Sequence, residues 1–380
     1  MTTKDITQFH PFNGKNAKFV GIWFTNACNL NCTYCYIKNK SDRTISIDKA
    51  MLILSEELNR DGELVDILFM GAETLTHFEE FKELVNRIAE GNWNRDYHFT
   101  ITTNGTLLTE EMKEWFVLNK NIITLGLSYD GDDGAQDTNR NNSSYKIDRE
   151  FFKRNWPNQP WKMTISAETA AESDKNIIAM HKQNVPFTVN VAYEESSWSD
   201  EQIEDYEKAL YRLADYYIEN PHVKPCTLFR LMGDIPEHPE KVVQERYCGA
   251  GDSLCFFDMD GDVYPCHMLS ALVMPKEKAL SGKYFSEDAE FEDPRCKKCS
   301  LKCNCYTCLG TNYLYRGDVK LRDPFHCKIY QVQIKATIHM WVGKLKEKKQ
   351  FTKKEKELIC ILRKNIDAFK SGKVGMQTEE

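Results

Sequence analysis

Six short apolar segments alternate with amphipathic stretches over the first half of the chain, and this pattern restricts the fold more than any other feature. The segments have the length and composition of strands, while the stretches between them repeat apolar residues at helical spacing. Ser46 and Thr109 stand directly before two of these stretches and are typical helix N-caps. The pattern predicts an α/β fold, a partial (β/α)6 barrel of TIM type with reactive groups at the carboxyl ends of its strands. The expected strands are residues 18–24, 65–71, 98–104, 122–130, 162–168 and 186–193.

Charge and hydropathy exclude several classes of protein. The formal net charge is −7 and the sequence pI is about 5.8, so no bulk attraction to nucleic acid or to an anionic membrane surface is expected. The chain has no apolar run of about 18 residues and no secretory signal at its start. We therefore expect a soluble, cytoplasmic protein that binds neither nucleic acid nor membrane.

Cysteine content points to metal binding. The chain has 14 cysteines, and without an export signal they are not expected to form disulfides. Ten of them lie between residues 226 and 327, where apolar periodicity is weak, so ligated metal is expected to replace a hydrophobic core there. The expected organisation is an N-terminal extension (1–17), a barrel (18–220), a linker (221–246), a cysteine-rich module (247–327) and C-terminal helices (328–380).

Three cysteines, Cys28, Cys32 and Cys35, follow the first expected strand in the segment TNACNLNCTYCYIK. Thiolates are soft ligands that suit zinc or iron-sulfur clusters, and structural zinc takes four protein ligands. Three cysteines without a nearby fourth ligand fit a [4Fe-4S] cluster with one iron open to a substrate or cofactor. The alternative is a zinc knuckle that a distant His or Cys completes.

The spacing CxxxCxxC, with Tyr34 before its last cysteine, resembles the signature of radical S-adenosylmethionine (SAM) enzymes. The resemblance implies that SAM chelates the open iron and that its reductive cleavage yields a 5′-deoxyadenosyl radical. It also implies a flavodoxin- or ferredoxin-type electron donor. The cofactors would carry this chemistry, while the protein supplies position and excludes water.

Later strand ends extend the resemblance to SAM-binding residues. Gly71 and Glu73 in FMGAE resemble the family's Gly-Gly-Glu motif, which holds the SAM amino group, although Ala72 and Thr74 depart from its usual Gly and Pro. Arg140 resembles the arginine that pairs with the SAM carboxylate; its alternative is a surface arginine. Two further strand ends, at which relatives contact the ribose and methionine parts, carry Asn104 and Ser128.

The later cysteines resemble the SPASM domain of peptide-modifying radical SAM enzymes, although the last gap, CYTC, is one residue shorter than usual. The resemblance implies two auxiliary [4Fe-4S] clusters, and the alternative is a pair of zinc ribbons. Cys303 could replace Cys305 if the short loop shifts register, and Cys226, Cys303 and Cys360 are otherwise expected to be buried packing residues. The implied ligands are Cys248, Cys255, Cys266 and Cys308 for the first cluster, and Cys296, Cys299, Cys305 and Cys327 for the second.

The resemblance implies oxidative modification of a ribosomally made peptide or protein, and a crosslink (thioether, C–C or C–O) is the expected product. Sulfatase-maturing relatives carry a base Asp directly after the cysteine equivalent to Cys266, but this chain has His267 there. His267 is a candidate catalytic base or a partner of the cluster. Alternatives are a formylglycine-generating sulfatase maturase and a noncatalytic zinc-ribbon interaction protein. Only 27 residues precede Cys28, so a leader peptide is expected to bind elsewhere on the chain or through a separate protein.

Overall fold

The computed structural model describes residues 18–192, 198–229, 238–241, 248–280 and 291–377. The expected N-terminal extension lies outside these ranges, as does part of the expected linker. The strands are β1 (Phe19–Thr25), β2 (Leu64–Gly71), β3 (Asp96–Thr103), β4 (Ile123–Leu127), β5 (Trp161–Ile165), β6 (Phe187–Val191), β7 (Leu254–Phe257) and β8 (Val263–Tyr264). The α-helices are α2 (Ile47–Leu58), α3 (Phe78–Glu90), α4 (Glu110–Leu118), α5 (Asp133–Asn139), α6 (Arg149–Asn155), α7 (Ser173–Lys182), α8 (Asp200–Glu219), α9 (Leu309–Arg316), α10 (Pro324–Lys346) and α11 (Lys353–Lys370). Short 3-10 helices are η1 (Thr74–His77), η2 (Ser144–Lys146), η3 (Ala170–Glu172), η4 (Thr227–Phe229), η5 (Pro239–Lys241), η6 (His267–Leu269), η8 (Pro294–Cys296) and η9 (Lys302–Asn304).

The predicted α/β architecture is confirmed, and all six predicted strands are present within a few residues of their expected bounds. Ser46 and Thr109 cap α2 and α4 as predicted, because each side chain accepts a hydrogen bond from a backbone N–H of the first turn. By packing, the described residues fall into two compact units. The described part of the first unit comprises residues 18–129, 140–161 and 248–280. The described part of the second comprises 130–139, 162–192, 198–229, 238–241 and 291–377.

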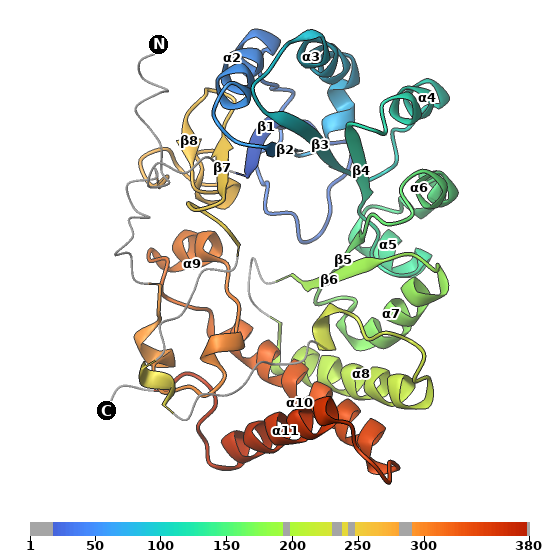
Figure 1. Cartoon of the computed structure of the whole chain (residues 1–380), viewed down its shortest axis with the longest axis vertical. Helices are drawn as coiled ribbons and strands as arrows, with labels where there is room; N and C mark the ends of the chain where they lie inside the picture. The colour runs from blue at the N-terminus through green and yellow to red at the C-terminus, as the bar shows by residue number, and fades with distance from the viewer. Residues whose placement is uncertain (1–17, 193–197, 230–237, 242–247, 281–290, 378–380) are drawn as a thin grey trace. The chain divides into compact units, whose positions relative to one another are not determined.

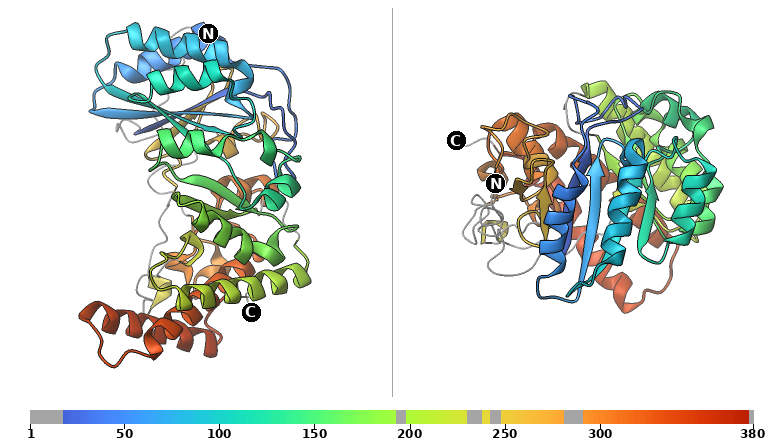
Figure 2. Two further views of the ribbon diagram at one scale, coloured as in Figure 1. Left: turned by 90° about the vertical axis from the view of Figure 1, so that its right-hand side faces the viewer. Right: turned by 90° about the horizontal axis from the view of Figure 1, so that it is seen from above.

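The first unit is built on a mostly parallel sheet in the order β4-β3-β2-β1-β7-β8 (Figure 1). Helices α2 and α3 cover one face of β1–β3 (Figure 2), where Phe24 and Phe69 of the sheet meet Phe81 of α3. Parallel strands of this kind bury both faces, and here their carboxyl ends share one edge. The outer edge of β4 is partly occupied by a side chain, since Trp156 Nε1 donates to the Ile123 carbonyl at 3.1 Å.

The cysteine-rich region contributes strands that the sequence did not predict. β7 pairs in parallel with β1, so that Cys255 lies beside Val20, and β8 returns antiparallel to β7. Phe256 is fully buried, and its ring fills the space that Gly21 leaves open. This part of the region therefore packs into the hydrophobic core of the first unit, which the sequence analysis did not expect.

The second unit contains the two-stranded sheet β5-β6 and a set of long helices. α8 packs against α7 and α10, and α10 packs in turn against α11 (Figure 1). The predicted helix over 201–219 and the predicted pair of C-terminal helices are thus present. The bounds of these two packing units differ from the bounds of the modules expected from the sequence. The division into those modules remains a prediction. Among the described residues, no helix has the length and apolar character needed to span a membrane.

Candidate active site

The three-cysteine loop is fastened to the carboxyl ends of several strands of the first unit. Its start is fixed by Thr25 at the end of β1, whose hydroxyl accepts a hydrogen bond from Ala27 N at 3.0 Å. The Ala27 carbonyl in turn accepts from Glu73 N at 2.8 Å, which joins the loop to the end of β2. Further along, Asn31 N donates to Asn141 Oδ1 at 2.9 Å. The backbone of the loop is therefore positioned before any cofactor binds.

The three cysteines of this loop, Cys28, Cys32 and Cys35, are all half-buried. Burial, with a smaller contribution from the Glu73 carboxylate, raises the pKa of Cys28 to about 11 against the lowering effect of the Leu30 N–H. A thiol of this kind is protonated at neutral pH unless a cation binds it, because metal ligation releases the proton. The donor set of three thiols thus fits a metal cluster.

Glu73 is the buried acid of the site and is only 2% exposed. Oε1 accepts hydrogen bonds from Thr103 Oγ1 at 2.9 Å and Leu75 N at 3.2 Å, and Oε2 accepts from Asn104 N at 2.8 Å. A carboxylate offers about four acceptor positions, so one position on Oε2 stays open to another donor. Burial raises the pKa of Glu73, while these three donors and Arg140 oppose the rise. Glu73 is therefore fixed in orientation and can take one more cationic N–H.

The other predicted SAM-binding residues also belong to the first unit. The Arg140 guanidinium lies over the Tyr34 ring, 5.4 Å from its centroid, and is 8% exposed, so it is not the surface arginine of the alternative interpretation. The Asn104 side chain is already engaged, since Nδ2 donates to Asn29 Oδ1 and Oδ1 accepts from Thr106. Ser128 is half-buried and continues the β4 ladder through its N–H to the Thr103 carbonyl.

Gly71 makes a close backbone contact that the sequence analysis did not predict. Its φ is +151°, and a Cβ there would lie 2.5 Å from the Thr25 carbonyl oxygen. A side chain at this position would therefore collide with the end of β1. The glycine permits close approach of β2 to β1 below the cysteine loop, and its expected contact with SAM stays a prediction.

Three residues that the sequence analysis did not single out support the site. Thr103 orients Glu73, Asn29 joins the cysteine loop to Asn104, and Asn141 accepts from the loop with φ of +54°. Asn is the residue type that most often tolerates this left-handed conformation. The NN pair after Arg140 was the one signal that could have revealed Asn141.

Comparison with known proteins agrees with this geometry. A model of the radical SAM superfamily matches residues 22–154, which contain the cysteine loop, Glu73 and Arg140. Residues 22–154 therefore form a radical SAM domain. It is 26% identical over 348 residues to a cysteine-type anaerobic sulfatase-maturating enzyme of Clostridium perfringens, covering 81% of this chain and 92% of that enzyme.

Two solved structures share the fold. A structure of native anSMEcpe with bound AdoMet and Cp18Cys peptide has a TM-score of 0.62 and 20% identity, covering 91% of this chain and 99% of the other. A structure of Streptococcus suis SuiB bound to precursor peptide SuiA has a TM-score of 0.50 and 18% identity, covering 85% and 77%. Both support the predicted partial-barrel fold.

His267, the candidate base, opens the 3-10 helix η6 directly after Cys266. The centroid of its ring lies 5.4 Å from that of Tyr36, a residue at the end of the three-cysteine loop, and 5.8 Å from that of Phe256. The structure therefore brings His267 beside the loop within the first unit. Whether it acts as a base remains a prediction.

The ligands implied for the first auxiliary cluster occupy dissimilar surroundings. Cys248 is exposed, Cys266 is half-buried before η6, and Cys308 caps α9 in the second unit. Cys255 is buried within β7, and burial and the Glu57 carboxylate raise its pKa well above the usual range, while Arg60 and Arg95 oppose this. Cys255 is also held in the ladder between β7 and β1 beside Val20, and its role as a ligand stays a prediction.

The four ligands implied for the second auxiliary cluster do come together. Cys296, Cys299, Cys305 and Cys327 line a single cavity of the second unit, which we call the four-cysteine cavity. Arg322 also lines it, and its charge lowers the pKa of Cys296, Cys299 and Cys305 against the larger effect of burial. A shared cavity with four soft donors and a cation fits an anionic iron-sulfur cluster.

The three cysteines without an implied ligand role differ in burial. Cys226 is buried as predicted, Cys303 is half-buried, and Cys360 is exposed, so its prediction as a packing residue was wrong. α11 exposes the side of the helix on which Cys360 lies, whereas Leu358 and Leu362 take the buried side. None of the described cysteines forms a disulfide, and in the described ranges no group of three or more His, Cys, Asp or Glu is arranged to hold a metal ion.

Proposed function

We propose that this radical SAM enzyme oxidatively modifies a ribosomally synthesised peptide, and that the modification is a crosslink. The observation that carries the proposal is the hydrogen bond from the Glu73 backbone N–H to the Ala27 carbonyl, which ties the three-cysteine loop to a residue whose buried carboxylate is only partly satisfied. It sets three thiols beside an acceptor for an ammonium group. Two further facts support peptide substrates: the solved relatives anSMEcpe and SuiB are described with bound peptides.

Each residue of the site has a defined task in this proposal. Cys28, Cys32 and Cys35 would hold a [4Fe-4S] cluster, which with bound SAM supplies a 5′-deoxyadenosyl radical for hydrogen abstraction. Glu73 Oε2 would accept from the SAM ammonium, and Arg140 would pair with the SAM carboxylate while Tyr34 holds the guanidinium plane. Asn104 and Ser128 would border the rest of SAM, and Asn29 and Thr106 fix the Asn104 amide.

Two auxiliary clusters, with the eight ligands implied by the resemblance, complete the proposal. The second set is supported by its shared cavity, whereas in the first set Cys255 is the weakest member. We further propose a flavodoxin- or ferredoxin-type electron donor, a possible separate leader-binding protein, and a cytoplasmic location. His267 would exchange a proton with the substrate or support the cluster beside it.

A second candidate function is formylglycine formation in sulfatases. The observation in its favour is the match to the C. perfringens sulfatase-maturating enzyme over 92% of that enzyme. Against it stands His267 where the resemblance places an aspartate in that family. A zinc-ribbon interaction protein is the third candidate, and it predicts zinc rather than iron in the purified chain.

Anaerobically reconstituted protein tests these functions together. We expect about twelve iron atoms per chain if three [4Fe-4S] clusters are present, and release of 5′-deoxyadenosine when SAM and a strong reductant are added. Incubation with candidate precursor peptides should give a loss of two hydrogens for each crosslink. Conversion of a Cys or Ser sulfatase-motif peptide to formylglycine would favour the second candidate, and zinc without iron the third. A variant with Cys28, Cys32 and Cys35 all replaced by alanine is the inactive control.

A further inference from the structure

Arg322 is a buried cation in the wall of the four-cysteine cavity. It is 3% exposed and lies on the turn before α10. The sequence around it, KLRDPF, is a typical helix entry and gives no sign of a cofactor contact. Removing a guanidinium from water is costly unless acceptors replace the lost hydration. The partners of Arg322 therefore indicate what the cavity is built to hold.

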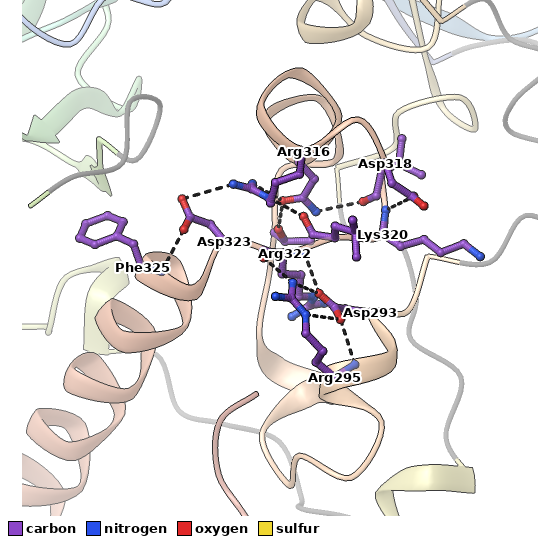
Figure 3. A network of polar contacts seen from close by, with 12 residues as sticks. Asp293, Arg295, Arg316, Asp318, Lys320, Arg322, Asp323 and Phe325 are labelled. Carbon is purple, nitrogen blue, oxygen red and sulfur yellow. Dashed lines mark hydrogen bonds and ion pairs between the residues drawn. The ribbon is translucent and has the colours of Figure 1, made fainter. Parts of the chain in front are cut away.

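The backbone of Arg322 is clamped by its neighbours (Figure 3). Its N–H donates to Asp293 Oδ2 at 2.8 Å, and its carbonyl accepts from Arg295 Nη2 at 2.8 Å. Asp293 is itself fixed by three further bonds from Arg295, through the backbone N at 2.9 Å, Nε at 3.0 Å and Nη2 at 2.6 Å. The Asp293 carboxylate is thus committed to Arg295 and to the Arg322 backbone.

The Arg322 guanidinium has few acceptors of its own. Nη1 donates to the Cys305 carbonyl at 3.0 Å, whereas buried Nε has no hydrogen-bond partner in the described part of the chain. No described carboxylate forms an ion pair with it. A full positive charge with an unused N–H is expensive in such a site. The ionisable side chains that share the cavity with Arg322 are the four cysteine thiols, Lys302, Asp323 and His326. Lys302 pairs with Glu292, and Asp323 pairs with Arg316, so the thiols are the groups left to interact with the Arg322 charge.

Other N–H groups already point at these sulfur atoms. Gln331 Nε2 donates to Cys327 Sγ at 3.4 Å, and Gly375 N donates to Cys299 Sγ at 3.4 Å. Gly375 follows α11, and Val374, Gly375 and Met376 form part of the cavity wall. Two of the four sulfurs therefore accept hydrogen bonds, as the sulfurs of a ligated cluster do.

We propose that Arg322, assisted by the N–H groups of Gln331 and Gly375, raises the reduction potential of an iron-sulfur cluster held by Cys296, Cys299, Cys305 and Cys327. The inference rests on the proposed function, because it assumes that this cluster is present. Positive charge and hydrogen bonds to sulfur both favour the more reduced, more negative state. Arg322 is a positioning and tuning residue here, since it acts on the cluster and not on the substrate.

The electron balance is simple. One added electron would convert a bound core from [4Fe-4S]2+ to [4Fe-4S]+. With four thiolate ligands the net charge would then change from −2 to −3, and no bond would break. The electron would come from dithionite in the titration below and from the oxidised substrate in the proposed reaction. Arg322 would stabilise the added negative charge.

Redox titration of the holoenzyme followed by EPR tests the inference. R322Q removes the charge and should shift one of the cluster potentials to a more negative value at unchanged iron content. R322K keeps the positive charge but loses the planar set of guanidinium N–H donors, and should shift the same potential less than R322Q does. Q331L removes one donor and should also give a small negative shift. R316Q is the matched control, because Arg316 belongs to the same polar network but does not line the cavity.

The outcomes separate the inference from the function on which it rests. Wild-type protein that lacks iron at these four cysteines would remove the cluster, and with it the inference. A full iron content with equal potentials in wild type, R322Q and R322K would overturn the role of Arg322 alone. If both variants lose the cluster, pulsed EPR of reduced wild-type protein with 15N-arginine decides: a nitrogen coupling supports the inference, and its absence contradicts it.

Discussion

The two predicted auxiliary cysteine sets differ in how the fold prepares them. Cys296, Cys299, Cys305 and Cys327 lie on successive short turns and the first turn of α10 within one unit, and they share a cavity. The described members of the other set lie at an exposed site, inside a sheet and before a 3-10 helix. Two cysteine sets predicted with the same role are therefore not equally pre-organised. Closely spaced cysteines on turns line one cavity, whereas the position of a cysteine inside a strand is fixed by the pairing of that strand.

The largest effect is expected for a ligand of the pre-organised set. C305A should remove about four iron atoms per chain and lower the thermal stability of the second unit, because ligation contributes folding free energy. C303A should retain full iron, since Cys303 is not among the residues that line the cavity. Iron analysis and calorimetry of the two anaerobic proteins provide the measurement. Loss of iron in C303A but not C305A would show that the short CYTC loop shifts the ligand register.

A variant of Cys255, in the set implied for the first auxiliary cluster, tests whether the sequence motif or the observed surroundings identify the ligands. If Cys255 is a ligand as the resemblance implies, C255A loses about four iron atoms. Its surroundings of Glu57, Arg60 and Arg95 predict instead that C255A keeps its iron, while C266A loses it. Iron content and cluster EPR signals compare the two variants. Equal losses in both would contradict the distinction drawn here between the sets.

The SAM site should respond to Glu73 more modestly. E73Q keeps the shape of the side chain but removes the charge, so the affinity for SAM should fall about tenfold or more, as expected for loss of one charge-assisted hydrogen bond of roughly 2 kcal/mol. Equilibrium binding of SAM to the anaerobic, cluster-loaded protein measures this. E79Q is the control, because Glu79 is an exposed carboxylate of α3. Unchanged affinity in E73Q would remove Glu73 from the SAM site.

The smallest effect concerns the pH dependence of stability in the second unit, away from both cysteine sets. Burial lowers the pKa of His181 from 6.5 to about 4, and its Nε2 lies 2.8 Å from the Tyr217 hydroxyl. The unfolded chain therefore binds a proton first as pH falls. This contribution to the free energy of unfolding is intact above pH 6.5 and is lost between 6.5 and 4. H181Q should flatten the slope in that window in denaturant titrations, and a slope identical to wild type would exclude His181.

Periodicity made the six strands and the capped helices predictable, because each has local signals in its own residues. β7 was missed because four residues, LCFF, carry too little pattern, and its strand state depends on pairing with β1. Asp130, two residues after Ser128, is 1% exposed and accepts hydrogen bonds from Thr164 N and Asn139 Nδ2. Such roles arise from tertiary contacts that no local motif records.

The wall of the four-cysteine cavity has a consequence for biogenesis. Its cysteines begin at Cys296, yet Val374, Gly375 and Met376 complete it. During translation the ribosome delivers the closing segment only after α10 and α11 have emerged. The cavity would therefore be open before residues 374–376 are in place and covered afterwards. A protein that delivers the metal cluster should act before this closing segment docks.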